Sequence, residues 1–452
     1  MMTHRISLSF TVVDSKGFMH SAGGSVTRIP QQRCSASWKK LGARSVGAPG
    51  ARADSRRKEK EENNGGHVRR ILFVAGGTGG HVYPALAIAD EVRRLDPAVE
   101  LLFAGTRERM EWLVVPKAGY AISAVPAVAI RRPFFCLPNL LLPARVLYCM
   151  WVCWKLVRRF RPHVVVGTGG YVAGPMCLVA ALSGSSKVVI QEQNAYAGIT
   201  NRILGRLAAA VIFLAFAAAS PFFPEEKCVV IGNPTRRALQ QPIDAVMALC
   251  SFFPSVNKLD LDDNDDDDDD DNGSTQEVVV VLGGSLGAQA INEAVAGLVQ
   301  SQLQQHPHRY FIWQTGTSHF QNIQAMGISH PRLTVLPYVD RMELLYAAAN
   351  VVVSRAGAIT CSELLVTAKP SILVPATTVA EDHQMKNAMA MVEAGAAKVL
   401  AESELNSQTL ASAIDEILGD KAGQKVMQEK AQKMAAPDAA VQIATRVLSL
   451  AA

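Results

Sequence analysis

The chain has 452 residues, of which 49% are apolar, with a net charge of +5 and eight cysteines. This length allows two domains with separate cores, and this composition excludes a mostly disordered protein. The cysteines form no C-x-x-C pair and no His/Cys cluster has zinc spacing, so the sequence predicts reduced thiols and no zinc site.

The charge is unevenly distributed along the chain. No Asp or Glu occurs from Trp112 to Gln191, so this region is strongly basic. Such a surface favours phosphate-bearing partners or an anionic membrane, and charge alone does not exclude nucleic acid.

Residues 1–66 differ in composition from the rest of the chain. Met1–Arg57 contains only Asp14 and Asp54 as acids, which is typical of an organelle transit peptide. A secretory signal would need a clear apolar core, and only Ile6–Val13 is apolar. The alternative is a disordered tail with no targeting role.

The first organising feature is an apolar run followed by glycines and a helical pattern. Ile71–Ala75 predicts a buried strand, Gly76–Gly80 a turn with exposed N–H groups, and Pro84 the first turn of a helix. This is a place where phosphate binds well, and His81 lies at its mouth. A single glycine loop is weak evidence. However, Val278–Leu282 followed by GGSLGA repeats the plan later in the chain.

Short apolar runs alternate with helical patterns from His67 onward, which predicts an α/β protein with two Rossmann-like, doubly wound domains facing a cleft. The expected divisions are a leader (1–66), a first domain (67–235), a linker with the disordered acidic tract Asp260–Asp271 (236–276) and a second domain (277–452). Val441–Leu450 is expected to return to the first domain. The predicted strands are Ile71–Ala75, Glu100–Ala104, Ala121–Val125, Val164–Gly167, Lys187–Gln191, Val211–Leu214, Cys228–Ile231, Val278–Leu282, Tyr310–Gln314, Leu333–Leu336, Val351–Ser354, Ser371–Val374 and Ala397–Leu400.

The segment Arg131–Arg161 combines aromatic, aliphatic and basic residues and has no acids. One interpretation is a core helix in which the large apolar residues point inward and the basic residues are solvated. The inward set would be Leu147, Trp151, Trp154 and Val157. The other interpretation adds a membrane-surface patch. Its apolar members would be Phe134, Phe135, Leu137 and Leu140–Leu142. Neither this segment nor the uncharged Leu207–Pro224 is expected to span a membrane.

Together with these two glycine loops, the chain contains six motifs in all. They are GGTGGH (Gly76–His81), GTGGYVAGP (Gly167–Pro175), QEQNAYAGITNR (Gln191–Arg202), GNPTR (Gly232–Arg236), GGSLGA (Gly283–Ala288) and SRAGAITCSE (Ser354–Glu363). Over most of His67–Ala436 the chain resembles the family-28 glycosyltransferases of bacterial peptidoglycan synthesis. The resemblance implies a GT-B fold and inverting transfer of N-acetylglucosamine (GlcNAc) from UDP-GlcNAc to the 4-hydroxyl of a lipid-linked muramyl-pentapeptide, which converts lipid I to lipid II.

The resemblance also implies which residues bind each substrate. The acceptor diphosphate would lie against the loops Gly76–Gly80 and Gly167–Tyr171, where Gly76, Gly77, Gly169, Gly170 and Tyr171 are assigned to the acceptor alone. The donor would contact Thr78, Gly79, Gly80, Asn194, Arg236, Ser285, Val339, Ala358, Ile359, Thr360, Cys361, Ser362, Glu363 and Gln384. Among these, Arg236 and Ser285 would lie at the diphosphate, Val339 near uracil, Glu363 at the ribose and Gln384 at the sugar hydroxyls.

The reaction needs a base at the acceptor hydroxyl, and His81 is the first candidate because histidine titrates near working pH. Glu192 is the alternative. Each also has a purely structural interpretation, His81 as a residue that orients the glycine loop and Glu192 as an acceptor for loop amides. Arg236 and loop amides would offset the diphosphate charge, so no metal or other cofactor is expected. No nucleic-acid partner is expected either.

The leader and the acidic tract depart from the bacterial pattern. A transit-like leader on such an enzyme predicts a chloroplast protein, peripheral on the stromal side of an envelope membrane. Two alternatives stay open: a plastid glycolipid transferase that uses UDP-galactose and diacylglycerol, and a nucleotide-binding scaffold without turnover. A donor assay with both acceptors separates them.

Overall fold

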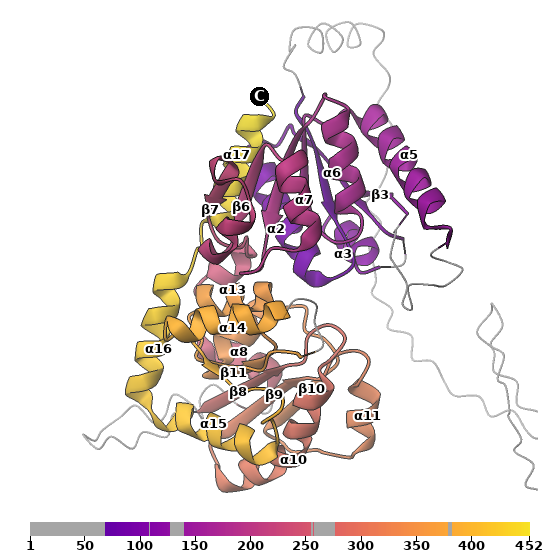
Figure 1. Cartoon of the computed structure of the whole chain (residues 1–452). Coiled ribbons are helices and arrows are strands. Elements are labelled where there is room, and N and C mark those ends of the chain that lie inside the picture. The colour runs from indigo at the N-terminus through magenta and orange to yellow at the C-terminus, as the bar shows by residue number, and fades with distance from the viewer. Residues whose placement is uncertain (1–67, 108, 127–139, 255, 257–275, 378–381) are drawn as a thin grey trace, which may run out of the picture. The chain divides into compact units, whose positions relative to one another are not determined.

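The structure is a computed structural model that describes residues 68–107, 109–126, 140–254, 256, 276–377 and 382–452 (Figure 1). Residues His67–Ala452 form one compact unit. Its described part contains two parallel β-sheets, each covered by helices. The predicted α/β class with two doubly wound sheets is therefore confirmed. The proposed leader and acidic tract lie outside the described residues.

The first sheet has seven parallel strands in the order β3-β2-β1-β4-β5-β6-β7. They are β1 (Arg70–Ala75), β2 (Glu100–Gly105), β3 (Ala121–Ala124), β4 (Val164–Gly169), β5 (Lys187–Glu192), β6 (Val211–Leu214) and β7 (Cys228–Val230). The central strands are continuous apolar runs because both of their faces are buried. The winding direction reverses between β1 and β4, so these two strands flank the switch point of the sheet.

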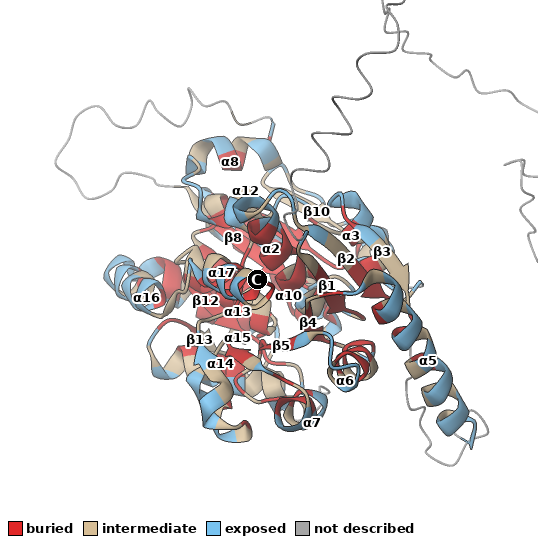
Figure 2. Cartoon of the chain, turned by 90° about the horizontal axis from the view of Figure 1, so that it is seen from above, coloured by how far each residue is buried: buried red, intermediate tan, exposed pale blue. Residues whose placement is uncertain are grey.

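Helices cover both faces of this sheet (Figure 2). They are α2 (Gly79–Leu95), α3 (Glu111–Lys117), α5 (Leu142–Phe160), α6 (Ala173–Leu182), α7 (Ile199–Leu207) and the C-terminal α17 (Ala439–Leu450), with 3-10 turns η1 (Ala217–Phe222) and η2 (Glu225–Lys227). One core contains α5, α6 and α7, and the other contains α2 and α17. The end of the chain therefore completes the core of the first sheet through Ile443 and Val447.

The second sheet has six parallel strands in the order β10-β9-β8-β11-β12-β13. They are β8 (Glu277–Leu282), β9 (Arg309–Gln314), β10 (Leu333–Leu336), β11 (Val351–Ser354), β12 (Ser371–Leu373) and β13 (Lys398–Val399). Its helices are η3 (Arg237–Gln240), α8 (Ala245–Phe252), α10 (Gln289–Gln305), α11 (Phe320–Ala325), α12 (Met342–Ala348), α13 (Ala358–Val366), α14 (His383–Glu393), α15 (Ser407–Gly419) and α16 (Lys421–Met434). The switch point here lies between β8 and β11.

All thirteen predicted strands are present, and their ends agree with the prediction to within two residues. The apolar segment Leu207–Pro224 contains the strand β6, followed by the 3-10 helix η1. Within the described ranges, no helix has the length and apolarity that a membrane crossing requires.

The inward set predicted for the basic apolar helix is wrong for three of its four members. In α5, Leu147 is 69% exposed, Trp151 51% and Trp154 45%. The buried stripe is instead Cys149, Cys153 and Val157. Spacings of four residues place these small side chains on one helical face, where they allow α5 to pack closely on α6. The bulky residues therefore lie on the exposed side of α5.

The segment predicted as a linker also contains regular structure. Ala245–Phe252 forms α8, which begins at Asp244, whose side chain accepts a hydrogen bond from the Met247 amide at 2.6 Å. Ala248 and Leu249 are buried in the core of the second sheet. This part of 236–276 therefore packs with the second sheet, where its apolar residues are buried.

Candidate active site

The glycine motifs lie at the switch points of the two sheets. GGTGGH follows β1 and GTGGYVAGP continues from β4, the two strands that flank the switch in the first sheet. GGSLGA follows β8, and the turn before α13 follows β11, in the same relation in the second sheet. Ligands of open α/β sheets bind at these positions, beyond the carboxyl ends of the strands.

The two glycine loops of the first sheet pack directly on each other. Gly170 has a φ of +86°, and a Cβ added to it would lie 2.2 Å from the Gly76 carbonyl oxygen. Gly169 has a φ of +114°, and its added Cβ would lie 2.6 Å from His81 Nδ1. Only glycine permits both this conformation and this approach. The predicted acceptor residues Gly76, Gly169 and Gly170 therefore lie together beside His81.

The orientation of His81 fixes which nitrogen is available for proton transfer. Its Nδ1 lies 2.9 Å from the Thr168 carbonyl oxygen, which accepts hydrogen bonds only, so Nδ1 carries the proton. In the neutral ring Nε2 then holds the lone pair. Burial lowers the pKa of His81, opposed by the charge of Glu192 and the bond to Thr168. The ring is therefore neutral near pH 7, as a base requires.

Glu192 is a fully engaged carboxylate at the end of β5. It is 1% exposed and accepts hydrogen bonds from the Asn194 amide at 3.1 Å, the Gly198 amide at 3.2 Å and Asn201 Nδ2 at 2.8 Å. Asn194 Nδ2 donates a further bond at 3.2 Å. These contacts shape the loop after β5 and match the structural interpretation of Glu192.

The glycine loop of the second sheet is held by Gln314. Its side chain accepts from the Gly284 amide at 3.1 Å and donates to the Gly284 carbonyl at 2.8 Å and the Pro337 carbonyl at 3.3 Å. The neighbouring Ser285 accepts through its carbonyl from Thr317. The Gln314 side chain therefore links the predicted donor loop to the turn that carries Tyr338.

Tyr338 connects the donor loop to the first sheet. Its hydroxyl shares a hydrogen bond with the hydroxyl of Tyr83, which lies in the first turns of α2, two residues after His81. The guanidinium of Arg236 lies 5.2 Å from the centre of the Tyr83 ring. The two glycine loops therefore approach one shared region of the molecule.

Arg236 is electrostatically coupled to Glu363. Burial raises the pKa of Glu363, opposed by the charge of Arg236 and by the hydrogen bond from Tyr346 at 3.0 Å. Arg236 Nε and the adjacent Thr235 Oγ1 are buried, and within the described residues neither has a hydrogen-bond partner. Buried donors normally have partners, so these two atoms are candidates for contact with an anionic ligand.

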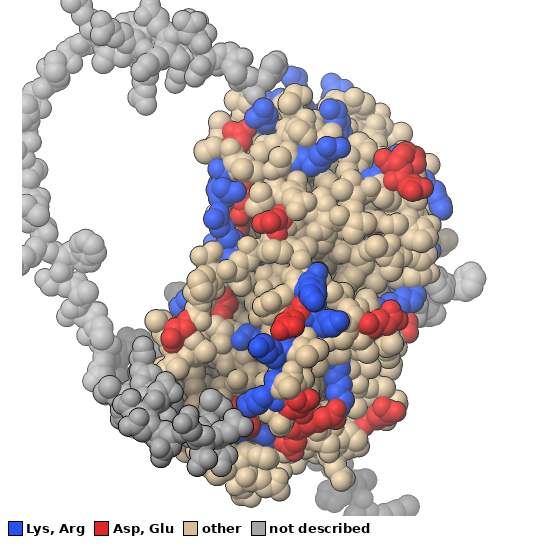
Figure 3. All heavy atoms as spheres, turned by 90° about the vertical axis from the view of Figure 1, so that its left-hand side faces the viewer, with Lys and Arg blue, Asp and Glu red and all other residues tan. Residues whose placement is uncertain are grey.

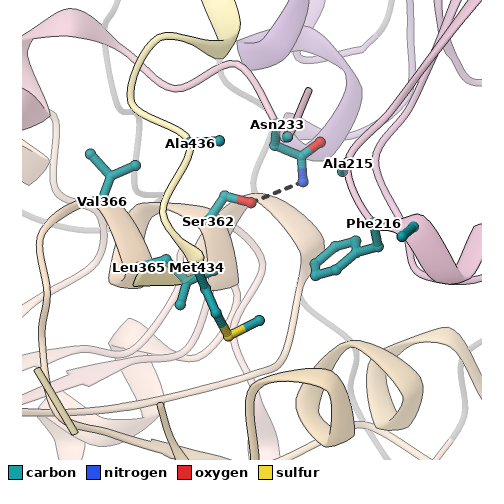
Figure 4. Close-up of a pocket in the computed structure, with 10 residues that line it drawn as sticks. Ala215, Phe216, Asn233, Ser362, Leu365, Val366, Met434 and Ala436 are labelled. Carbon is teal, nitrogen blue, oxygen red and sulfur yellow. Dashed lines mark hydrogen bonds between the residues drawn. The ribbon is translucent and has the colours of Figure 1, made fainter. Parts of the chain in front are cut away.

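Two buried asparagines join the sheets, and the sequence analysis assigned a role to neither. Asn233 Nδ2 donates to Ser362 Oγ at 2.9 Å (Figure 4). It also donates to the Gln193 carbonyl at 3.0 Å. Asn387 Oδ1 accepts from the Ala195 amide at 3.0 Å. Asn233 belongs to the motif GNPTR and Asn387 lies three residues after Gln384, but only the structure shows that both residues link the two halves.

The other predicted donor residues are distributed around α13 and α14. Val339 is buried in the core of the second sheet, and Gln384 accepts from the Ala376 amide at 2.9 Å. Ala358, Ile359, Thr360, Cys361 and Ser362 form the start of α13 after Gly357. Tyr171, assigned to the acceptor, is 63% exposed beside the first-sheet loops. These assignments stay predictions.

A small pocket of about 200 Å³ lies next to the Asn233–Ser362 contact (Figure 4). Apolar side chains such as Phe216, Leu365 and Met434 form most of its lining. It offers few groups for a nucleotide, so it is not assigned to either substrate.

Two doubly wound sheets with phosphate-type loops that approach a shared region define the GT-B class of glycosyltransferase fold. Residues 71–213 match the model of the glycosyltransferase family 28 N-terminal domain, and residues 278–443 match that of the C-terminal domain. The chain belongs to glycosyltransferase family 28.

Individual relatives are similar over nearly their whole length. The chain is 45% identical over 381 residues to the UDP-N-acetylglucosamine–N-acetylmuramyl-(pentapeptide) pyrophosphoryl-undecaprenol N-acetylglucosamine transferase of Salinibacter ruber, covering 84% of this chain and 96% of the relative. The chain is 35% identical to the Flavobacterium psychrophilum enzyme of the same name, covering 84% of this chain and 97% of the relative. The crystal structure of Acinetobacter baumannii MurG aligns with a TM-score of 0.63 and 26% identity, covering 84% of this chain and 99% of that one.

Proposed function

We propose that this protein transfers GlcNAc from UDP-GlcNAc to the 4-hydroxyl of a lipid-linked muramyl-pentapeptide, converting lipid I to lipid II. The observation that carries the proposal is the approach of the two glycine loops, through Tyr83 and Tyr338, with His81 beside one loop and Arg236 between them. The names of the similar bacterial enzymes supply the substrates.

The residues divide the chemistry between the two sheets. The acceptor diphosphate binds at the loops after β1 and β4, and UDP-GlcNAc binds at the loops after β8 and β11. Arg236 Nε and Thr235 Oγ1, which are buried donors, take part of the donor diphosphate charge. Glu363 accepts from the ribose hydroxyls.

The transfer is a single displacement at the anomeric carbon. The acceptor 4-oxygen forms a bond to that carbon as the bond to the UDP oxygen breaks, and UDP leaves with the electron pair. His81 Nε2, which holds a lone pair, takes the hydroxyl proton. Attack opposite the leaving group inverts the configuration.

An anionic membrane surface is the proposed peripheral partner, and α5 is the proposed contact. Its outer face exposes Leu147, Trp151 and Trp154, and Lys155 and Arg158 lie over the two tryptophan rings. This helix has four basic residues and no acid. By contrast, the face seen in Figure 3 mixes basic and acidic side chains. Aromatic and basic residues on one helical face suit a headgroup region. Of the predicted patch, Phe134, Phe135 and Leu137 lie outside the described residues.

The proposed location is the stromal side of a chloroplast envelope membrane. Its support is the acid-poor composition of Met1–Arg57, which is typical of transit peptides. A fluorescent fusion to residues 1–66 tests it, and a mitochondrial or cytosolic signal would contradict it.

The decisive experiment measures incorporation of labelled GlcNAc into a lipid I analogue by the full chain and by a version that begins at His67. Incorporation with retention of the UDP-GlcNAc requirement supports the proposal. Label that appears only from UDP-galactose in a diacylglycerol product would replace it by glycolipid synthesis. Binding of UDP-GlcNAc without any transfer would indicate a nucleotide-binding scaffold without turnover.

A further inference from the structure

A buried carboxylate that the mechanism above does not use lies against the glycine loop that follows β1. Glu111, the first residue of α3, has 0% of its surface exposed. Its Oε2 accepts a hydrogen bond from the Gly77 amide at 3.1 Å. Its Oε1 accepts from the Thr106 amide at 2.9 Å and from the Thr106 hydroxyl. One side chain therefore ties the loop after β1 to the loop after β2.

The surrounding backbone is built to admit this carboxylate. A Cβ added to Gly105, the last residue of β2, would lie 2.5 Å from Glu111 Cγ. A Cβ added to Gly76 would lie 3.2 Å from Glu111 Oε1. Glycine at these two positions leaves the room that the side chain occupies. Among the described residues Glu111 has no ion pair, so hydrogen bonds from three donors offset its charge.

The bond from Gly77 changes which amides face a ligand. Because the Gly77 N–H points inward to Glu111, it is not available to an anion bound over the loop. Gly77 also has a φ of +92°, a conformation that favours glycine. An acceptor diphosphate therefore has to bind the amides that follow, at the start of α2, next to His81.

We propose that Glu111 is a positioning residue for the acceptor: it fixes the backbone of the glycine loop, and so places the acceptor diphosphate at the start of α2 and the acceptor hydroxyl near His81. The proposal rests on the function proposed above, because the ligand of this loop is taken to be the acceptor. It predicts that Glu111 affects acceptor binding and leaves donor binding unchanged.

The main test uses Glu111→Gln in the full chain. Glutamine has nearly the same shape, but one of the two acceptor oxygens is replaced by an NH2 group, which only donates. The side chain therefore cannot accept from Gly77 and from Thr106 at the same time. We expect the KM for a lipid I analogue to rise about 10- to 100-fold, with the Kd for UDP within about 2-fold of the unaltered chain. Glu111→Asp keeps the charge but has a shorter side chain. Its KM for the lipid I analogue should lie between those of the unaltered chain and of Glu111→Gln.

Glu91→Gln is the matched control. Glu91 is 5% exposed in α2 and bonds to Arg94 at 2.6 Å, away from the loop. It should lower the melting temperature without raising the acceptor KM. An unchanged acceptor KM in Glu111→Gln, or an equal loss of UDP affinity and acceptor affinity, would overturn the positioning role.

Amide exchange of residues 74–83 separates this inference from the proposed function. Exchange at Gly77 should quicken at least about 10-fold in Glu111→Gln, whatever the substrates are. If the unaltered chain fails to use lipid I while this exchange still quickens, the proposed function fails and the loop-fixing part stands. If Glu111→Gln does not fold, Glu111→Asp, whose shorter side chain withdraws the carboxylate from the Gly77 amide, gives the same comparison. Unaltered Gly77 exchange in the folded variants contradicts the inference.

Discussion

The carbonyl oxygen of Gly76 and the Cα of Gly170 are so close that no side chain can enter between them: an added Cβ on Gly170 would lie 2.2 Å from that oxygen. This contact joins the two glycine loops of the first sheet. Gly170→Ala should therefore cost about 2 to 4 kcal/mol of unfolding free energy and most of the turnover, because strain at positive φ adds to a backbone clash.

Gly184 provides the control for this substitution, because its φ is +66° and an added Cβ meets nothing within 4 Å. Gly184→Ala should cost only about 1 kcal/mol and leave turnover unchanged. Chemical denaturation and acceptor kinetics measure both effects. Equal behaviour of the two variants would show that the loop contact is unimportant.

The lowered pKa of His81 predicts the acid side of the pH profile. The base must be neutral, and burial lowers the pKa of this ring. Turnover should therefore fall with acidification only below about pH 6.5, the ordinary histidine value. His81→Ala should lower kcat by about two to four orders of magnitude and remove this limb, with donor binding nearly unchanged.

His330→Gln is the control for this pH profile, since His330 bonds to the Arg332 amide in the second sheet region. It should leave the profile in place. Turnover that survives in His81→Ala and is lost in Glu192→Gln, with the loop still folded, would assign the base to Glu192.

Arg236 is expected to bind the donor diphosphate. Arg236→Ala should weaken UDP-GlcNAc binding by about 2 kcal/mol, which is about 30-fold in Kd, because a buried charged donor is removed. Arg237→Ala removes the same charge from the exposed neighbouring residue and should change Kd little. Calorimetric titration with UDP decides between them, and equal affinities would place the diphosphate elsewhere.

Asn387 is expected to couple the two halves. It is 0% exposed and accepts from the Ala195 amide while donating to Asn194 and to the Ala356 carbonyl. Asn387→Ala leaves these groups unpaired and should cost about 1 to 3 kcal/mol, with a fall in kcat. Asn350→Ala, which removes a bond to the Val278 amide inside the second sheet, should lower stability alone. A normal kcat in Asn387→Ala would argue against this coupling.

We also expect turnover without an added divalent metal. Arg236 and the loop amides at the start of α2 and after β8 offset the diphosphate charge in the proposed site. Turnover in EDTA should equal turnover in magnesium. An activity that EDTA abolishes and magnesium restores would contradict this expectation.

The number and type of strands followed from local pattern, because parallel strands such as Val278–Leu282 are buried on both faces and so are apolar throughout. The glycine motifs likewise predicted the turns that follow β1, β4 and β8. The predicted inward face of α5 is wrong. The prediction assigned the large apolar residues to the core, whereas the buried residues include the small Cys149 and Cys153. Side-chain size indicates burial only when the facing helix has room.

The sequence by itself determined two doubly wound α/β domains and the glycine loops at their switch points, since strand burial and turn geometry depend on neighbouring residues. Only the tertiary structure decided which side chains meet across the loops. Glu111 beneath Gly77, Thr168 beside His81 and Asn387 beside Ala195 are separated by 34 to 192 positions in the chain. Contacts over such distances arise from the order of the strands and the packing of the helices, which no local pattern records.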